Sequence, residues 1–138
     1  MEIFGISLFG WRLNSGAIPE SIIELEYQLK VKLPTDFQEL ISRFDGGEGP
    51  LGSMNIRILG TTEVVSFNSD YSVFRRIPSY FAFATDGGDY CITYHRDSMM
   101  IHSFPLGALA EDEGKQLAGS LRELFQRVSI GQITDSDI

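Results

Sequence analysis

The chain has 138 residues, 43% of them hydrophobic and 22% charged, which is typical of one globular domain with its own core. Acidic side chains outnumber basic ones by 19 to 11, giving a net charge of −8; this argues against nucleic acid or an anionic membrane as a direct partner, because both are bound through basic side chains. The single cysteine, Cys91, excludes an internal disulfide and favours a reducing compartment.

Residues 1–12 alternate loosely between apolar and polar positions and predict a short strand or an extended segment. The N-terminus lacks the basic region of a secretory signal, and no apolar run approaches the roughly 18 residues of a membrane span. We therefore expect a cytoplasmic protein in which residues 1–18 form an extended segment packed on the core.

Residues 19–47 predict two short helices joined at a sharp corner. The corner falls at Pro34, because proline fixes φ and disfavours helix in the residue before it. The first helix, from Pro19, places apolar side chains on one face, namely Ile22, Leu25 and Leu29, with Ile23 flanking. The second follows the i, i+3, i+4, i+7 pattern of a buried helix face, with Phe37, Leu40, Ile41 and Phe44. Gly46 and Gly47 are expected to end it.

The next stretch, residues 48–53, is rich in glycine and proline and predicts a loop. Gly47, Gly49 and Gly52 reproduce the spacing of a dinucleotide-binding loop. That motif requires a preceding strand and a following helix, whereas a helix precedes it here and a strand is expected after it. We therefore expect no nucleotide cofactor, and no other cofactor is indicated.

Alternating apolar residues predict a strand over 55–59, and a threonine-capped helical turn is expected over 61–67. The segment 68–72 is polar and predicted to be exposed. The clearest strand signals are residues 80–85 and 90–95, which flank a turn at Asp86-Gly-Gly-Asp89.

A third strand is predicted over residues 99–104, completing an antiparallel meander that the strand at 55–59 joins. After a connector at 105–110, a final helix is predicted from about 111 to 128, with acidic residues at its start and basic ones near its end. Residues 132–138 are expected to be a flexible tail.

Catalytic chemistry has few candidates in this chain. If the turn between the last two predicted strands has two residues, Cys91 faces His102 as a possible thiol–imidazole pair, but a one-residue change in register separates them. A small buried core residue is the favoured interpretation of Cys91. Asp86 and Asp89 are better explained by the hairpin turn than by a metal loop or an acid–base pair. We predict neither a catalytic nor a metal site.

Protein binding offers more candidates. Tyr71 lies beside Asp70 in the polar segment, and tyrosine is frequent in interface hot spots, whereas core packing is the favoured interpretation of Trp11 and Tyr80. Loops held by a rigid scaffold often carry contact residues. The predicted partner-binding residues are Glu48, Asp70, Tyr71, Asp86, Asp89 and Tyr90.

Three stretches, taken in order, resemble the SUKH superfamily, the domain of bacterial toxin-immunity proteins and of fungal cell-wall (glucan) synthesis regulators. The stretches are Leu33-Pro34-x-Asp36-Phe37 with the Asp45-Gly46-Gly47 stop, Phe81-Ala-Phe-Ala-Thr-Asp-Gly-Gly-Asp89, and Pro105-Leu-Gly107 with Leu117-Ala-x-Ser-Leu-x-Glu-Leu-Phe125. The resemblance covers residues 19–128. Family members often carry an asparagine or a third glycine at the turn, where this chain has only Gly87 and Gly88.

The resemblance implies an α+β fold, with helices packed against a mainly antiparallel sheet of about four to six strands, as a single domain over residues 19–131. It implies no enzymatic activity. In bacteria it implies binding to a cognate toxin, for instance a nuclease whose basic surface would attract an acidic inhibitor. A regulatory adaptor of the cell-wall synthesis type is the alternative, and an enzyme using Cys91 with His102, or Asp86 with Asp89, is a remote third.

Overall fold

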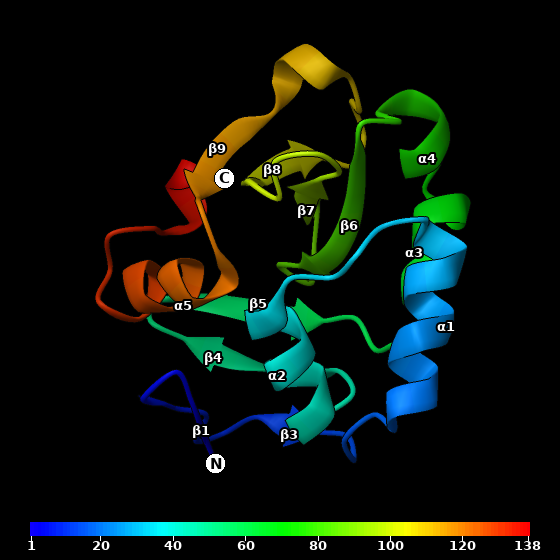
Figure 1. Cartoon of the computed structure of the whole chain (residues 1–138). Coiled ribbons are helices and arrows are strands. Elements are labelled where there is room, and N and C mark those ends of the chain that lie inside the picture. Colours follow the sequence, from blue (N-terminus) through cyan, green and yellow to red (C-terminus); the bar gives the residue numbers. More distant parts are fainter.

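The computed structural model describes residues 1–138 and is built on a long antiparallel sheet (Figure 1). Its strands are β1 (Glu2–Ile3), β2 (Ile6–Ser7), β3 (Arg12–Leu13), β4 (Gly47–Leu51), β5 (Met54–Ile58), β6 (Tyr80–Thr85), β7 (Tyr90–His95), β8 (Ile101–Pro105) and β9 (Lys115–Ala118). Its α-helices are α1 (Pro19–Leu29), α2 (Thr35–Arg43), α3 (Val64–Asp70), α4 (Val73–Arg76) and α5 (Leu121–Ser129). Strands β3 to β9 form one seven-stranded sheet in sequence order, and β1 and β2 form a separate hairpin. The α+β class is confirmed, although the sheet has more strands than the four to six expected.

Strand β4 accounts for part of that difference, because the predicted loop over 48–53 is wrong. Residues 47–51 pair antiparallel with β5, and Gly52, with φ +56°, provides the tight turn between them. The glycines of β4 read as loop signals in the sequence, but Gly49 has another role. A Cβ there would lie 2.4 Å from the Trp11 ring, so the missing side chain makes room for the indole.

Strand β9 accounts for the rest, because the single helix predicted over 111–128 is three elements. A 3₁₀ turn, η1 (Glu111–Glu113), precedes β9, and α5 begins only at Leu121. The Ser120 hydroxyl accepts a hydrogen bond from the Glu123 N–H at 3.1 Å, which makes it the N-cap. Leu117, which falls within the predicted helix, instead lies buried on the edge strand.

The two predicted helices of residues 19–47 are confirmed, with one change at their end. Helix α1 ends at Lys30 in the left-handed conformation, and α2 ends at Arg43, before the glycine pair. Gly46, with φ +88°, packs where a Cβ would meet the Gly60 backbone nitrogen at 2.8 Å, and Gly47 already begins β4. The glycines therefore turn the chain into the sheet rather than capping the helix.

Helices α1, α2 and α5 contribute to the main core against the sheet, while α4 and the 104–109 region form a smaller cluster on the other side. Helix α3 runs beside β6, and here the prediction of an exposed segment over 68–72 is wrong at its first residue. The Asn68 side chain is fully buried. Its amide accepts from the Ala82 N–H at 2.7 Å and donates to the Ala82 carbonyl at 2.9 Å. The amide thus replaces a strand's peptide group where β5 has diverged from β6.

Both ends of the chain contribute to the core. Ile3 and Leu8 are buried, and the Phe4 ring packs edge-on against Phe125 of α5. Residues 132–138, which we expected to be a flexible tail, bury Ile133 and Ile138. No helix has the length and apolar character needed to cross a membrane.

Candidate partner-binding surfaces

The thiol–imidazole pair that one register would have allowed does not form. The β7–β8 register places Cys91 opposite Phe104 and His102 opposite Thr93. The Cys91 side chain is fully buried, and this burial raises the pKa of its thiol to about 12, so no reactive thiolate forms near neutral pH. Cys91 is a core residue, as the favoured interpretation held.

The two histidines belong to an aromatic cluster. The Tyr80 ring lies 5.0 Å from that of His95 and 5.3 Å from that of His102, and it packs on Phe104. The His95 Nδ1 atom accepts hydrogen bonds from the N–H groups of the following loop. Burial lowers the pKa of His102. No group of three or more potential ligand side chains could hold a metal ion. The cluster packs β6 against the β7–β8 hairpin.

The interpretation of residues 86–89 as a turn is confirmed. The Asp86 Oδ1 atom accepts from the N–H groups of Gly88 at 2.9 Å and Tyr90 at 3.3 Å, and Gly87 has φ +82°. Asp86 therefore holds its own turn, whereas the exposed Asp89 carboxylate has no hydrogen bond or ion pair within the protein. The two carboxylates therefore have different surroundings.

The predicted partner-binding residues divide into two surfaces. Glu48 pairs with Arg12 at 3.1 Å, and its other carboxylate oxygen lies 3.8 Å from where a Cβ on Gly87 would sit. Glu48 therefore lies near Gly87 of the turn, and we name Glu48 together with the turn residues Asp86, Asp89 and Tyr90 the turn surface. Asp70 and Tyr71 lie apart from it at the end of α3, and Tyr71 is 49% exposed and packed on the Phe67 ring.

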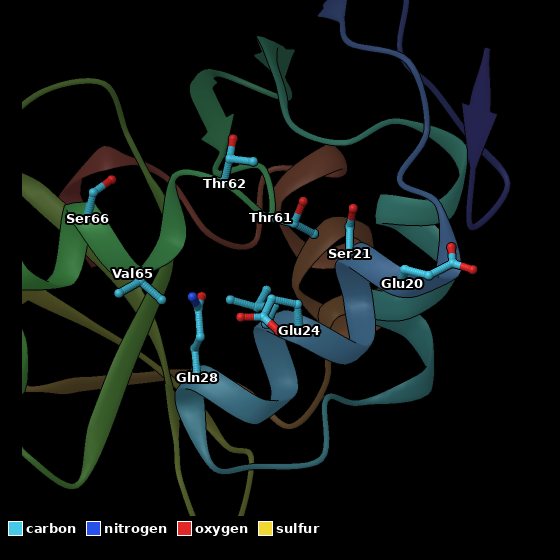
Figure 2. A pocket seen from close by; sticks show the side chains of 9 residues that line it. Glu20, Ser21, Glu24, Gln28, Thr61, Thr62, Val65 and Ser66 are labelled. Atoms are coloured by element: carbon cyan, nitrogen blue, oxygen red, sulfur yellow. The ribbon is translucent and has the colours of Figure 1, made fainter.

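A further groove lies elsewhere, between α1 and the segment that leads into and includes the start of α3 (Figure 2). It has a volume of about 560 Å³. We name it the α1 groove, and its lining consists of Glu20, Ser21, Glu24, Leu25, Gln28, Thr61, Thr62, Val65 and Ser66. Figure 2 shows Gln28 and Glu24 projecting from α1 toward the opposite wall, with Glu20 at the far end.

The wall opposite α1 is fixed by hydrogen bonds that two carboxylates accept. The Asp45 carboxylate accepts from both the N–H and the hydroxyl of Thr61, each at 2.7 Å. The Glu63 carboxylate accepts from the Gly60 N–H at 3.1 Å and pairs with Arg57. The groove is therefore bounded by a braced loop on one side and a helix on the other.

The outer side of α1, next to the groove-lining Glu20 and Glu24, carries exposed apolar side chains. Ile23 is 65% exposed and Tyr27 is 79% exposed, one helical turn apart on the outer side of α1. Glu20 and Glu24 beside them form no hydrogen bond or ion pair through their carboxylates. Sequence reasoning missed this surface, although Ile23 and Tyr27 both lie off the buried stripe of α1 with i, i+4 spacing, a signal that was available.

Residues 16–127 match the model of the SMI1/KNR4 family (SUKH-1). No curated protein sequence matches the chain. The family match includes α1, the braced loop and the turn surface. The hairpin β1–β2 and the last residues that close the core lie outside it.

Proposed function

The chain belongs to the SMI1/KNR4 family (SUKH-1), and on that basis we propose that it is a non-enzymatic domain that neutralises a cognate toxin by binding it directly. The SUKH superfamily, which the sequence resembles, includes both toxin-immunity proteins and cell-wall synthesis regulators. The net charge of −8 of this chain suits the immunity role better. The buried Cys91 thiol is compatible with action in the cytoplasm.

The observation that carries the proposal is that carboxylates without a hydrogen-bond or ion-pair partner lie next to exposed apolar side chains. Asp70 precedes the half-exposed Tyr71 in the chain, and Glu24 follows the exposed Ile23 and precedes the exposed Tyr27 on α1. Such groups add nothing to the core, but they suit a basic protein surface, which they would attract and then contact through aromatic anchors. A nuclease toxin, whose substrate site is basic, has this chemistry.

The six predicted residues remain our proposal for part of the contact. The turn surface, with Glu48, Asp86, Asp89 and Tyr90, offers carboxylates on a rigid hairpin edge, and the end of α3 adds Asp70 with Tyr71. Rigid elements support both, so little ordering entropy would be lost when a partner binds.

The test is co-expression with the toxin encoded by the adjacent gene. We expect the chain to restore growth of cells that produce the toxin and to co-purify with it as a complex. Absence of both rescue and complex would overturn the proposal. Recovery of wall-synthesis proteins from the native cell, in place of a toxin, would favour the adaptor alternative.

A further inference from the structure

We propose that the α1 groove receives an arginine or lysine side chain of a protein partner, and that Ile23 and Tyr27, on the outer side of α1 next to Glu20 and Glu24, contact an adjoining apolar side chain of the same segment. The inference rests on the proposed function only for the identity of the partner. The chemistry of the occupant follows from the groove itself.

The first argument is that the groove presents hydrogen-bond acceptors. The Thr61 hydroxyl donates its proton to the Asp45 carboxylate at 2.7 Å, and the Ser66 hydroxyl donates its proton to the Glu63 carbonyl at 3.1 Å. Because each hydroxyl has one proton, these oxygens have only lone pairs to offer a ligand. Two groups that are usually ambivalent are thus fixed as acceptors.

The second argument is charge. Glu20 and Glu24 are the only ionisable side chains among the nine that line the groove, and neither is neutralised within the protein. An anionic ligand would be repelled, whereas a cation rich in donors would satisfy carboxylates and hydroxyls together. A guanidinium has five N–H donors and an ammonium has three, and neither accepts a hydrogen bond.

The third argument is shape and polarity. The groove includes two apolar residues, the buried Leu25 and the half-buried Val65, against which the hydrocarbon stem of arginine or lysine can pack. Its volume of about 560 Å³ lies within the range of about 300–1,000 Å³ that is common for ligand sites.

The fourth argument distinguishes a protein segment from a free cation. Ile23 and Tyr27 are large and exposed, and a small polyamine in the groove would leave them in water. A peptide chain that carries a basic side chain beside an apolar one would cover both, which is the arrangement of a charged group next to a buried anchor in protein interfaces.

The main experiment measures binding of the adjacent-gene toxin by calorimetry. The groove variant is Glu20→Gln with Glu24→Gln, and the matched control is Asp112→Asn with Glu113→Gln, which removes the same charge from exposed carboxylates of η1 without hydrogen-bond partners. We expect the groove variant to bind about 30-fold more weakly or worse, as for the loss of an interface hot spot. The control should change affinity by less than about threefold, through reduced long-range attraction alone.

A second pair of variants tests the proposed contact of Ile23 with an apolar side chain of the partner. Ile23→Ala is compared with Ile130→Ala, because Ile130 is 70% exposed at the end of α5, far along the chain from the groove. We expect a loss of about fivefold or more in affinity for the first variant and none for the second. Equal effects within both pairs, with toxin binding retained, would overturn the inference and leave the proposed function standing.

A second measurement applies if the toxin does not bind the unaltered protein, in which case the proposed function fails. Displayed random peptides are then selected on the unaltered protein and tested on the groove variant and its control. Enrichment of arginine or lysine beside an apolar residue, with binding lost only on the groove variant, supports the inference. Selected peptides without basic residues, equal binding by both variants, or spermidine binding as tightly as the peptides would overturn it.

Discussion

Two sets of acidic residues lie within residues 19–47 and behave in opposite ways. Glu26, Asp36 and Asp45 turn toward the protein, and each accepts a hydrogen bond from a backbone N–H of a distant or following segment: Leu33 at 2.7 Å, Arg122 at 3.1 Å and Thr61 at 2.7 Å, respectively. Glu20 and Glu24 face outward and accept none. Asp36 and Asp45 belong to the motifs that resemble the family, whereas Glu20, Glu24 and Glu26 lie outside those motifs.

This difference separates what identifies the fold from what can recognise a partner. Glu26 secures the corner between α1 and α2, Asp36 binds the first turn of α5, and Asp45 fixes the loop before α3. A backbone N–H at a bend or helix start lacks an intrahelical partner, so an acid there is structurally required. Within residues 19–47, the carboxylates of Glu26, Asp36 and Asp45 are therefore engaged, whereas those of Glu20 and Glu24 keep their charge available.

The largest effect on stability should come from Phe37, a core residue of α2. Its ring is buried and packs edge-on against Phe83 at 5.6 Å and Tyr94 at 6.0 Å. We expect Phe37→Ala to lower the free energy of unfolding by roughly 3–5 kcal/mol, measured by urea denaturation, because it leaves a cavity. Tyr27→Ala on the outer face serves as the control and should change it by less than about 0.5 kcal/mol. A near-neutral Phe37→Ala would contradict the assignment of the helix face.

A buried amide outside the motifs should have the next largest effect. Asn68→Leu removes both hydrogen bonds to the Ala82 peptide group. We expect a loss of about 2–4 kcal/mol in the free energy of unfolding, since a buried donor and a buried acceptor are left unpaired.

The comparison variant is Asn68→Asp, which retains the acceptor for the Ala82 N–H but loses the donor to its carbonyl. Hydrogen exchange of the Ala82 amide should rise in Asn68→Leu. Unchanged exchange there would show that the side chain does not complete the strand edge.

The next largest effect on stability is expected at Asp45, an acid of the family motif. Asp45→Ala removes two hydrogen bonds to Thr61, and we expect the free energy of unfolding to fall by about 1–3 kcal/mol. Because the same bonds brace the wall of the α1 groove, NMR signals of Thr61 and Thr62 should also shift or broaden. A stability loss without any change at these two residues would mean that Asp45 does not position the groove.

Much of the fold could be predicted from local patterns. The i, i+3, i+4, i+7 spacing around Phe37 and the apolar runs flanking Asp86 predicted a helix and a hairpin that the structure contains. The failures share one physical cause. The glycines of β4 read as a loop, but the chain has glycine there because Trp11 packs on the strand from a distant position. Strand β9 likewise depends on pairing with β8, which a local acidic and apolar pattern does not encode.

The surface was harder to predict than the fold. Loop position suggested Glu48 and Asp86, yet the structure shows both engaged, with Arg12 and with the backbone of their own turn. The free carboxylates of α1 looked like the ordinary solvent face of a helix. Whether an acid is satisfied depends on segments far away in sequence, so only the folded chain distinguishes the two kinds.

The smallest stability effect should belong to the outward acids, and this is the sharpest test of the comparison. We expect Glu20→Gln with Glu24→Gln to change the free energy of unfolding by less than about 0.5 kcal/mol, because neither carboxylate has a partner to lose. Glu26→Gln, on the same helix, should cost more, since the carboxylate that accepts from the Leu33 N–H is replaced by a neutral amide. Urea denaturation of the three proteins decides the point. If the outward double variant is as destabilised as Glu26→Gln, these acids support the fold after all, and the case for a cation-binding groove loses the free charge on which it depends.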